Sequence, residues 1–422
     1  KVYIIIYTMK LNLKIVKNNL LLIIILSLTL RVLNLYFFEG IYLHYGEDDE
    51  HYFKIASYVE ENGLLNWQSI DRPPLISLII VPIIKIFNYS FSLIFIKLLM
   101  IFLSISTCIS LYFLSLEITK SYKISFLISL IYSFYPFSIY MSGRLYTENL
   151  ATLLICLISL FFIKFINKHH IKFLLIVSFL MGLLSLTRSS YFYLPFFLSF
   201  TILLINKNII KKLLYISTMF LIFFMTLSPW IIKNYFQLNE YVPTTTRLGY
   251  GLWLSNNDFS NKTIKNGGYE RTEKFKEEIE YSKSFDPIKK SNYLKEKALK
   301  EIKNNKLEFV KACIFRFLNF FNPKPNPYKK FTLKDMVMIT FFSPFLVIFF
   351  LSLINKNYNF EKIILLTIIF YALVTHIPFY GMPRFRFPVD GLIFLLAVTY
   401  LFENTNSKSF LKFLSRLKFF RE

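Results

Sequence analysis

Residues 47–50 are all acidic (Glu, Asp, Asp, Glu) and are the first candidates for chemistry in this chain. They follow the first long apolar run of a strongly basic protein with a formal net charge of +23. Adjacent carboxylates repel one another, and a carboxylate is well suited to accept the proton of an attacking hydroxyl. We therefore predict that Asp49 is a general base with Asp48 beside it. A solvated acidic loop is the alternative interpretation.

The other unusual polar residues adjoin apolar runs, and most are arginines. A charge at a membrane segment is costly and by default marks a functional path. Such a site suits the transfer of a group from a phosphate-bearing lipid, because arginine holds phosphate oxygens through paired hydrogen bonds. One carboxylate is then enough, since a lipid phosphate leaves without a proton. Glycoside hydrolysis, by contrast, needs a second carboxylic acid to protonate the leaving oxygen. Plainer interpretations are interfacial anchoring for the arginines and a favourable helix N-terminus for the acid. The candidate phosphate-binding residues are Arg72, Arg144, Arg188, Lys233, Arg384 and Arg386, and Glu148 is a further candidate catalytic acid.

The elements that position these residues must be membrane helices. The 422-residue chain is 55% hydrophobic with a mean hydropathy of +0.48, which is too apolar for a soluble protein of this length. Apolar runs of about 17 to 25 residues recur, the length that a helix needs to cross a bilayer. The predicted fold class is therefore an all-α polytopic membrane protein. The lysines form short clusters between runs, which argues against a nucleic-acid partner, and the three cysteines are too widely spaced for a metal site.

The lysine clusters also predict the topology. If they lie in the cytoplasm, both termini are cytoplasmic and every candidate residue lies at the outer face of the plasma membrane. The short proline-bearing run 75–87 then lies in the interface. The first apolar run is predicted to be an anchor rather than a signal peptide, and Met9 is a candidate start. About ten spans are expected, near residues 19–38, 91–117, 124–141, 148–166, 173–187, 190–206, 213–232, 333–354, 361–379 and 389–404.

Four regions follow from this topology. An N-terminal catalytic membrane module is predicted at 1–238, an extracytoplasmic cap at 239–330, C-terminal membrane helices at 331–404 and a basic cytoplasmic tail at 405–422. Within the cap, Tyr250, Trp253 and Asn256 are candidates for holding an acceptor sugar through stacking and amide hydrogen bonds. A folded cap without a binding role would also account for them.

Six short motifs follow one another along the chain. They are Asp49-Glu50-His51-Tyr52, Arg72-Pro73-Pro74-Leu75, Gly143-Arg144 with Thr147-Glu148, Leu186-Thr187-Arg188, Pro229-Trp230 with Lys233-Asn234-Tyr235, and Arg384-Phe385-Arg386 with Pro388. In type and order they resemble the motifs of the C-type (GT-C) membrane glycosyltransferases. The resemblance covers nearly the whole chain and is greatest to bacterial relatives of dolichyl-phosphate-mannose protein mannosyltransferases (family 39) and of the aminoarabinose transferase that modifies lipid A. Two positions depart from the pattern: Lys233 replaces an arginine and loses its fork geometry, and Phe385 replaces a tyrosine.

The resemblance implies an inverting transfer of a sugar from a polyprenyl-phosphate donor, with the first-loop acid as base. The acceptor would be a hydroxyl of a membrane lipid, a glycan or a protein. Apart from the resemblance, Asp49 and Glu148 are candidates for sharing a divalent cation through oxygen ligands, and the sequence leaves metal dependence open. Two alternatives are a transporter or flippase for lipid-linked saccharides, for which internal repeats are expected, and a polysaccharide polymerase or ligase with its charges in a large late loop.

Overall fold

The computed structural model describes residues 12–44, 48–67, 70–257, 273–282, 284–327, 330–354 and 359–404. Within these ranges the chain forms helices and no β-strand, which confirms the predicted all-α class. Glu47, Met9 and the predicted tail at 405–422 lie outside the described residues. The helices are α1 (Leu13–Asn34), η1 (Leu35–Glu39), α2 (Asp48–Asn62), η2 (Leu64–Asn66), α3 (Leu75–Ile86), α4 (Tyr89–Thr119), α5 (Tyr122–Ser133), α6 (Pro136–Ser142), α7 (Thr147–Lys168), α8 (Ile171–Thr187), η3 (Ser189–Tyr191), α9 (Leu194–Leu203), α10 (Ile209–Leu238), α11 (Leu248–Ser255), α12 (Glu273–Ser282), α13 (Pro287–Asn304), α14 (Lys306–Phe320), α15 (Leu333–Ile354), α16 (Phe360–His376) and α17 (Pro383–Asn404).

Each of the ten expected spans overlaps at least one of these helices. Among the described residues, six helices are long and apolar enough to cross a bilayer: α1 with η1, α4, α7, α10, α15 and α17. A seventh span results if α5 and α6, which meet at an angle of 59°, are counted together. Helix α3 has only 12 residues and is too short for a full crossing. The chain is thus a multi-pass membrane protein, and the count of ten spans stays a prediction.

Helices α7 and α17 form the centre of the bundle. Both are buried around most of their circumference, as expected of a helix that is apolar on all sides. Helix α7 packs against α4, α8 and α17, and α17 packs against α15 and α16. By contrast, α1 and α10 expose large apolar side chains such as Leu21, Ile25 and Leu221. Those faces suit contact with lipid.

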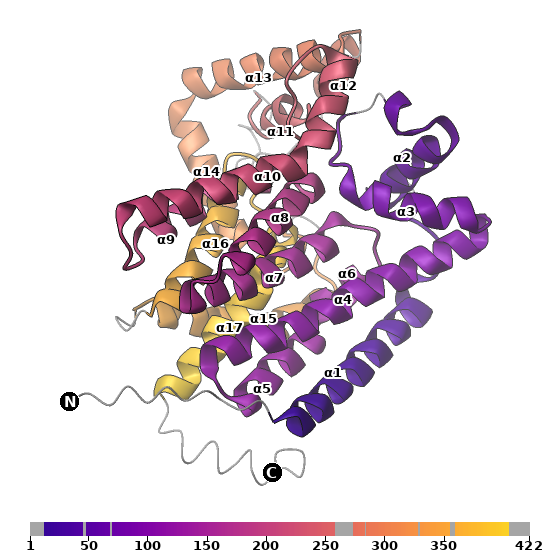
Figure 1. Ribbon diagram of the computed structural model, residues 1–422. Helices are drawn as coiled ribbons and strands as arrows, with labels where there is room; N and C mark the ends of the chain where they lie inside the picture. The colour runs from indigo at the N-terminus through magenta and orange to yellow at the C-terminus, as the bar shows by residue number, and fades with distance from the viewer. Residues whose placement is uncertain are drawn as a thin grey trace.

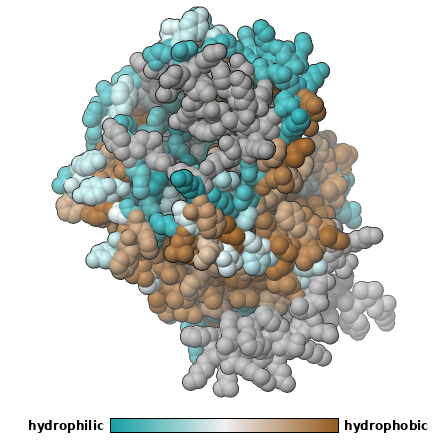
Figure 2. All heavy atoms as spheres, turned by 180° about the vertical axis from the view of Figure 1, so that it is seen from behind, coloured by the Kyte–Doolittle hydropathy of each residue, from teal (hydrophilic) through white to brown (hydrophobic). Residues whose placement is uncertain are grey.

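Above the bundle, α11, α12 and α13 lie together at the top of the view in Figure 1. Figure 2 shows hydrophilic side chains over this upper region and a band of hydrophobic side chains below it. Helix α11 packs on α13 at very short range, because a Cβ atom added at Gly249 would lie 1.8 Å from the backbone oxygen of Ser291. The predicted division into four regions stays a prediction, although α10 ends at Leu238, where the cap was expected to begin.

Several helices start at a polar residue that caps their free backbone N–H groups. The side chains of Asn88, Asn208 and Asn359 accept hydrogen bonds from the third residue beyond, at 3.1, 2.9 and 2.9 Å. Such caps stabilise a helix start by about 1 kcal/mol each. They fix the starts of α4, α10 and α16, and of these helices α10 carries the candidate Lys233.

Gly381 holds α14 next to the segment that leads into α17. A Cβ atom at this position would lie 1.7 Å from the backbone oxygen of Arg316. We expect Gly381→Ala to destabilise the protein by about 1–3 kcal/mol or more, since overpacking forces the backbone apart. A lower thermal midpoint in detergent would show this. Gly251→Ala is the control, because its Cβ would meet Phe379 at an ordinary 3.6 Å; equal midpoints for the two variants would contradict the expectation.

Candidate active site

Arg384, near the end of the chain, contacts two acids from much earlier in the sequence, Asp48 and Glu148. Its Nη2 atom lies 2.7 Å from Oδ2 of Asp48, and its Nε atom lies 2.5 Å from Oε1 of Glu148. Two further guanidinium groups complete the cluster: Arg72 Nη2 lies 2.8 Å from Oδ1 of Asp48, and Arg188 Nη1 lies 2.8 Å from Oε1 of Glu148. We call these five side chains the arginine cluster.

The arginine cluster forms where several helix ends meet. Asp48 opens α2, Glu148 is the second residue of α7, Arg384 is the second residue of α17, and Arg188 caps the end of α8. The start of α7 also favours a negative side chain at Glu148, because helix N-termini carry partial positive charge. The acids and arginines that were expected on one side of the membrane therefore lie at the same end of the bundle.

Asp49 lies beside the arginine cluster, in a second group of residues formed with Arg144 and Leu145. Its side chain is fully buried, and Oδ1 accepts a hydrogen bond of 2.7 Å from the backbone N–H of Leu145. Its Oδ2 atom lies 3.4 Å from Nε of Arg144 but accepts no hydrogen bond from the described residues. One carboxylate oxygen is thus held in place, while the other can still accept a proton.

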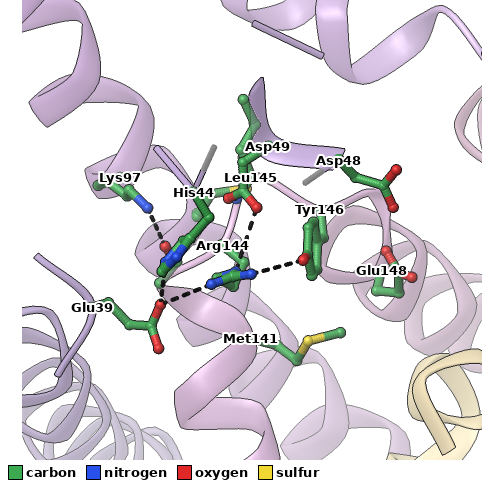
Figure 3. Close-up of polar contacts among 12 residues, drawn as sticks. Glu39, His44, Asp48, Asp49, Lys97, Met141, Arg144, Leu145, Tyr146 and Glu148 are labelled. Carbon is green, nitrogen blue, oxygen red and sulfur yellow. Dashed lines mark hydrogen bonds and ion pairs between the residues drawn. The ribbon is translucent and has the colours of Figure 1, made fainter. Parts of the chain in front are cut away.

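Two residues that support Asp49 were not predicted. Glu39, at the end of η1, lies 3.4 Å from Nη1 of Arg144 and 2.9 Å from Nε2 of His44. Lys97 of α4 donates a hydrogen bond to the carbonyl of Gly143, the residue before Arg144. Figure 3 shows this network around Arg144. A charged residue within or at the end of an apolar run was the available signal for both.

Tyr146 lies between the two groups. Its hydroxyl accepts a hydrogen bond of 2.9 Å from Nη2 of Arg144, and the guanidinium of Arg384 lies 3.9 Å from its ring centroid. In Figure 3 the Asp48 and Glu148 carboxylates lie on one side of Tyr146 and the Arg144 guanidinium on the other. A cation over an aromatic face contributes about 1 kcal/mol or more when it is desolvated. Tyr146 therefore couples the position of Asp49 to that of the arginine cluster.

The two adjacent aspartates have opposite electrostatic surroundings. Burial favours the neutral acid at Asp48, but the guanidinium groups of Arg384 and Arg72 outweigh it and hold the pKa of Asp48 well below its usual value. At Asp49 burial dominates over Arg144 and the Leu145 N–H, so the pKa of Asp49 is raised. Two carboxylates whose pKa values are pushed apart suit two different roles: a permanent anion at Asp48 and a proton acceptor at Asp49.

Removal of the Tyr146 hydroxyl tests the coupling. We expect Tyr146→Phe to lower kcat for the reaction of this site by about tenfold, the size of one lost charge-assisted hydrogen bond, with little change in the thermal midpoint. Tyr146→Leu removes the ring below Arg384 as well and is expected to cost more. Equal kcat values for Tyr146→Phe and the unmodified protein would show that Tyr146 does not position Arg144.

Three of the predicted phosphate-binding residues are not part of the arginine cluster: Arg144 contacts Asp49, and Arg386 and Lys233 lie away from both groups. The Arg386 side chain is 1% exposed; its Nε lies 2.6 Å from Oδ1 of Asp390, and its Nη1 donates to the carbonyls of Phe320 and Asn322 at 2.8 and 3.0 Å. Lys233 donates to the carbonyl of Trp67 at 2.6 Å and lies 4.6 Å from the Trp230 ring centroid. Within the described part of the chain, neither residue contacts Asp48 or Glu148.

The three predicted acceptor residues, Tyr250, Trp253 and Asn256, have different surroundings. Trp253 is buried against Leu294 and Ala298 of α13. Asn256 is held by the carbonyl of Pro378 at 2.9 Å and by Nη1 of Arg316 at 3.1 Å. Tyr250 alone borders an open cavity. Phe385, at the position where the resemblance led us to expect tyrosine, stacks on His376 at a centroid distance of 5.1 Å.

The predicted cation site does not fit the side chains in this arrangement. The Glu148 carboxylate is already held by Arg384, Arg188 and the hydroxyl of Thr147, while Asp49 lies on the other side of Tyr146. Among the described residues, no three His, Cys, Asp or Glu side chains are placed to bind one metal ion. A cation between Asp49 and Glu148 would have to displace guanidinium groups.

Comparison by sequence finds a match to a protein family. Residues 71–232 match the family model of dolichyl-phosphate-mannose-protein mannosyltransferase. This part of the chain contains Arg72, Arg144, Glu148 and Arg188, but neither the first-loop acids nor Arg384. A search of curated proteins finds no match.

Comparison by structure finds the same architecture in archaeal oligosaccharyltransferases. The chain is similar to oligosaccharyltransferase AglB from Archaeoglobus fulgidus in complex with an inhibitory peptide and a dolichol-phosphate, with a TM-score of 0.60 and 13% identity over 95% of this chain and 51% of that one. An apo form of the Archaeoglobus fulgidus enzyme matches with a TM-score of 0.58 and 14% identity over 94% and 52%. The chain thus spans about half the length of these proteins. Together with the family match, the shared fold confirms the predicted resemblance to the C-type glycosyltransferases.

Proposed function

We propose that this multi-pass membrane protein is a glycosyltransferase of the C type that transfers a sugar from a polyprenyl-phosphate donor to a hydroxyl acceptor, with inversion at the anomeric carbon. The observation that carries the proposal is the contact of Arg384 with both Asp48 and Glu148. Three guanidinium groups and two carboxylates leave the arginine cluster with one net positive charge. A sugar joined to a lipid by a phosphodiester carries one negative charge, so the cluster matches it.

In the proposed reaction, Asp49 takes the proton of the acceptor hydroxyl. The hydroxyl oxygen attacks the anomeric carbon from the side opposite the phosphate, the bond from that carbon to the phosphate oxygen breaks, and the phosphate keeps the electron pair. Arg384, Arg72 and Arg188 stabilise the negative charge that develops on the phosphate, the kind of electrostatic assistance that contributes most to many enzymes. The single displacement inverts the configuration, and the proton remains on Asp49.

Asp49 is a better candidate for the base than Asp48, because its raised pKa gives it a higher proton affinity and efficient bases have a pKa near the working pH. Arg144 and the Leu145 N–H are positioning groups for Asp49 in this scheme. The proposal leaves out Arg386 and Lys233, whose polar atoms are engaged elsewhere. It also involves no metal ion, because Arg384 and Arg188 hold the Glu148 carboxylate that would have to share the ion with Asp49.

We further propose that the site faces outward from the plasma membrane and that both termini are cytoplasmic. The support is the distribution of basic clusters, such as Lys120 with Lys123 and Lys207 with Lys211, at the bundle end opposite the arginine cluster in the predicted topology. The acceptor is a lipid, a glycan or a protein. The solved complex of AglB with dolichol-phosphate supports a lipid-linked donor.

A transfer assay tests the proposal. The purified protein in lipid nanodiscs would receive a polyprenyl-phosphate carrying a radiolabelled hexose, with a membrane extract as the source of acceptor. We expect free polyprenyl phosphate to accumulate while the label enters a new glycosidic bond of inverted configuration. In proteoliposomes, movement of the labelled lipid between leaflets without a new glycosidic bond would contradict the proposal and favour a flippase.

A further inference from the structure

A cavity of about 460 Å³ lies between the first loop and the cap. This volume is in the range of small-molecule sites. Three segments contribute to its wall: the stretch before α3, the stretch from the end of α10 into α11, and the start of α13. The lining residues are Ile70, Asp71, Thr246, Arg247, Tyr250, Phe285, Pro287, Lys290 and Ser291.

The cavity wall combines positive charge with aromatic rings. Arg247 and Lys290 are cationic, and Asp71 is the one acid among the described residues of the wall. Arg247 is 36% exposed, and its ion pair with Asp71 is long, at 3.7 Å; Lys290 has no ion pair in the described part of the chain. Neither cation is therefore tied closely to a carboxylate, and both can bind an anionic group.

The wall also contains two aromatic side chains, Tyr250 and Phe285, and the hydroxyl groups of Thr246 and Ser291. The Arg247 guanidinium lies 5.0 Å from the Tyr250 ring centroid, and Phe285 is held by Tyr293 at a centroid distance of 5.3 Å. The Ser291 hydroxyl accepts a hydrogen bond from the Gly249 N–H at 3.3 Å and keeps its own proton for donation. Fixed aromatic faces next to hydroxyl and cationic donors suit a sugar ring that carries an acidic group.

The cavity lies next to the arginine cluster, because Asp71 lines the cavity and the following residue, Arg72, belongs to the cluster. Asp71 lines the cavity and contacts both Arg247 and His51 of α2, while the next residue, Arg72, contacts Asp48. Arg247 is also close enough to contribute to the lowered pKa of Asp48. A molecule in the cavity would thus lie next to the residues that we assign to the donor phosphate.

We propose that this cavity binds the acceptor and that the acceptor is an acidic saccharide, with a phosphate or carboxylate group that Arg247 and Lys290 neutralise. The saccharide is either free or carried by a lipid. The assignment as acceptor site rests on the proposed function, whereas binding of an acidic saccharide does not. Tyr250 is the one predicted acceptor residue that borders this cavity, and Lys290 and Phe285 are additional members of the site.

Binding measurements with simple probes test the inference. The full-length protein in nanodiscs would be titrated calorimetrically with mannose 6-phosphate, mannose and inorganic phosphate. We expect mannose 6-phosphate to bind at least about tenfold more tightly than either other probe, and Lys290→Gln to weaken it by about tenfold, the size of one charge-assisted hydrogen bond. Lys289→Gln is the matched control, because Lys289 is 79% exposed and pairs with Asp286, the residue that caps the start of α13.

Three outcomes would overturn the inference: equal binding of mannose and mannose 6-phosphate, equal binding of inorganic phosphate and mannose 6-phosphate, or equal effects of the two lysine variants. Lipid-borne and free acceptors are distinguished by repeating the titration with a phosphorylated glycolipid incorporated in the nanodisc. Tighter binding of the glycolipid than of mannose 6-phosphate indicates a lipid-borne acceptor, and weaker binding a free one. If the probes behave as expected but sugar transfer survives the loss of Arg384, the proposed function fails and the saccharide site stands.

Discussion

Asp49→Asn is expected to lower kcat for sugar transfer by about 10³-fold, within the range that a positioned general base contributes. The amide keeps the shape of the side chain and can still accept the Leu145 N–H bond, but it cannot take a proton. Donor binding should change little, because Asp49 lies apart from the arginine cluster. Initial rates over a range of donor concentrations would separate kcat from KM. A kcat within threefold of the unmodified protein would remove Asp49 as the base.

Asp48→Asn is the matched control, one residue away in the same helix turn. Asp48 already faces Arg72 and Arg384, so its loss is expected to alter donor binding and KM more than kcat.

The pH dependence of sugar transfer gives a second check of Asp49 as the base. The base must be ionised to accept a proton, and burial raises the pKa of Asp49. As the pH is lowered, kcat/KM should therefore start to fall at a higher pH than it would for a base with the ordinary pKa of an aspartate.

Arg384→Gln is expected to abolish transfer and also to destabilise the protein. It removes the main cation from Glu148, whose side chain is fully buried, and breaking a buried ion pair from one side costs about 3–5 kcal/mol. Transfer would fall because the leaving phosphate loses its central guanidinium. The thermal midpoint in detergent and the transfer rate in nanodiscs measure the two effects separately.

A double variant distinguishes folding from chemistry at Arg384. In Arg384→Gln with Glu148→Gln the uncompensated carboxylate is gone, so much of the lost stability should return. Transfer should remain absent, because the phosphate still lacks Arg384. Recovery of transfer together with stability would mean that Arg384 only neutralises Glu148 and does not act on the donor.

The sequence predicted the side chains that meet in the arginine cluster, but it also predicted two that lie elsewhere, Arg386 and Lys233, and it did not predict the pairing. Asp48, Arg72, Glu148, Arg188 and Arg384 were all candidates, because charges beside membrane spans are rare and costly. The pairing depends on side-chain directions that a motif does not specify. The separation of Arg384 from Arg386 is one example: residues two apart on a helix point to opposite sides, and the start of α17 turns Arg386 toward Asp390, four residues further on.

Other features depend on tertiary contacts that the sequence does not reveal. The break between α5 and α6 follows from Pro136, which the sequence does show, yet its 59° bend was not predicted. The cavity under the cap is formed by segments about 175 and 215 residues beyond Asp71, and it requires the close contact of Gly249 with Ser291. Periodicity and hydropathy predict the helices, whereas such long-range contacts are set by packing.

The most direct test is a structure of the protein in a nanodisc with bound polyprenyl monophosphate. We predict that the phosphate lies within about 3 Å of the Arg384 guanidinium, with Arg72 and Arg188 around it and the Asp49 carboxylate beyond Tyr146 on the acceptor side. A phosphate bound at Arg386 or Lys233, with Arg384 still paired to both Asp48 and Glu148, would contradict the account.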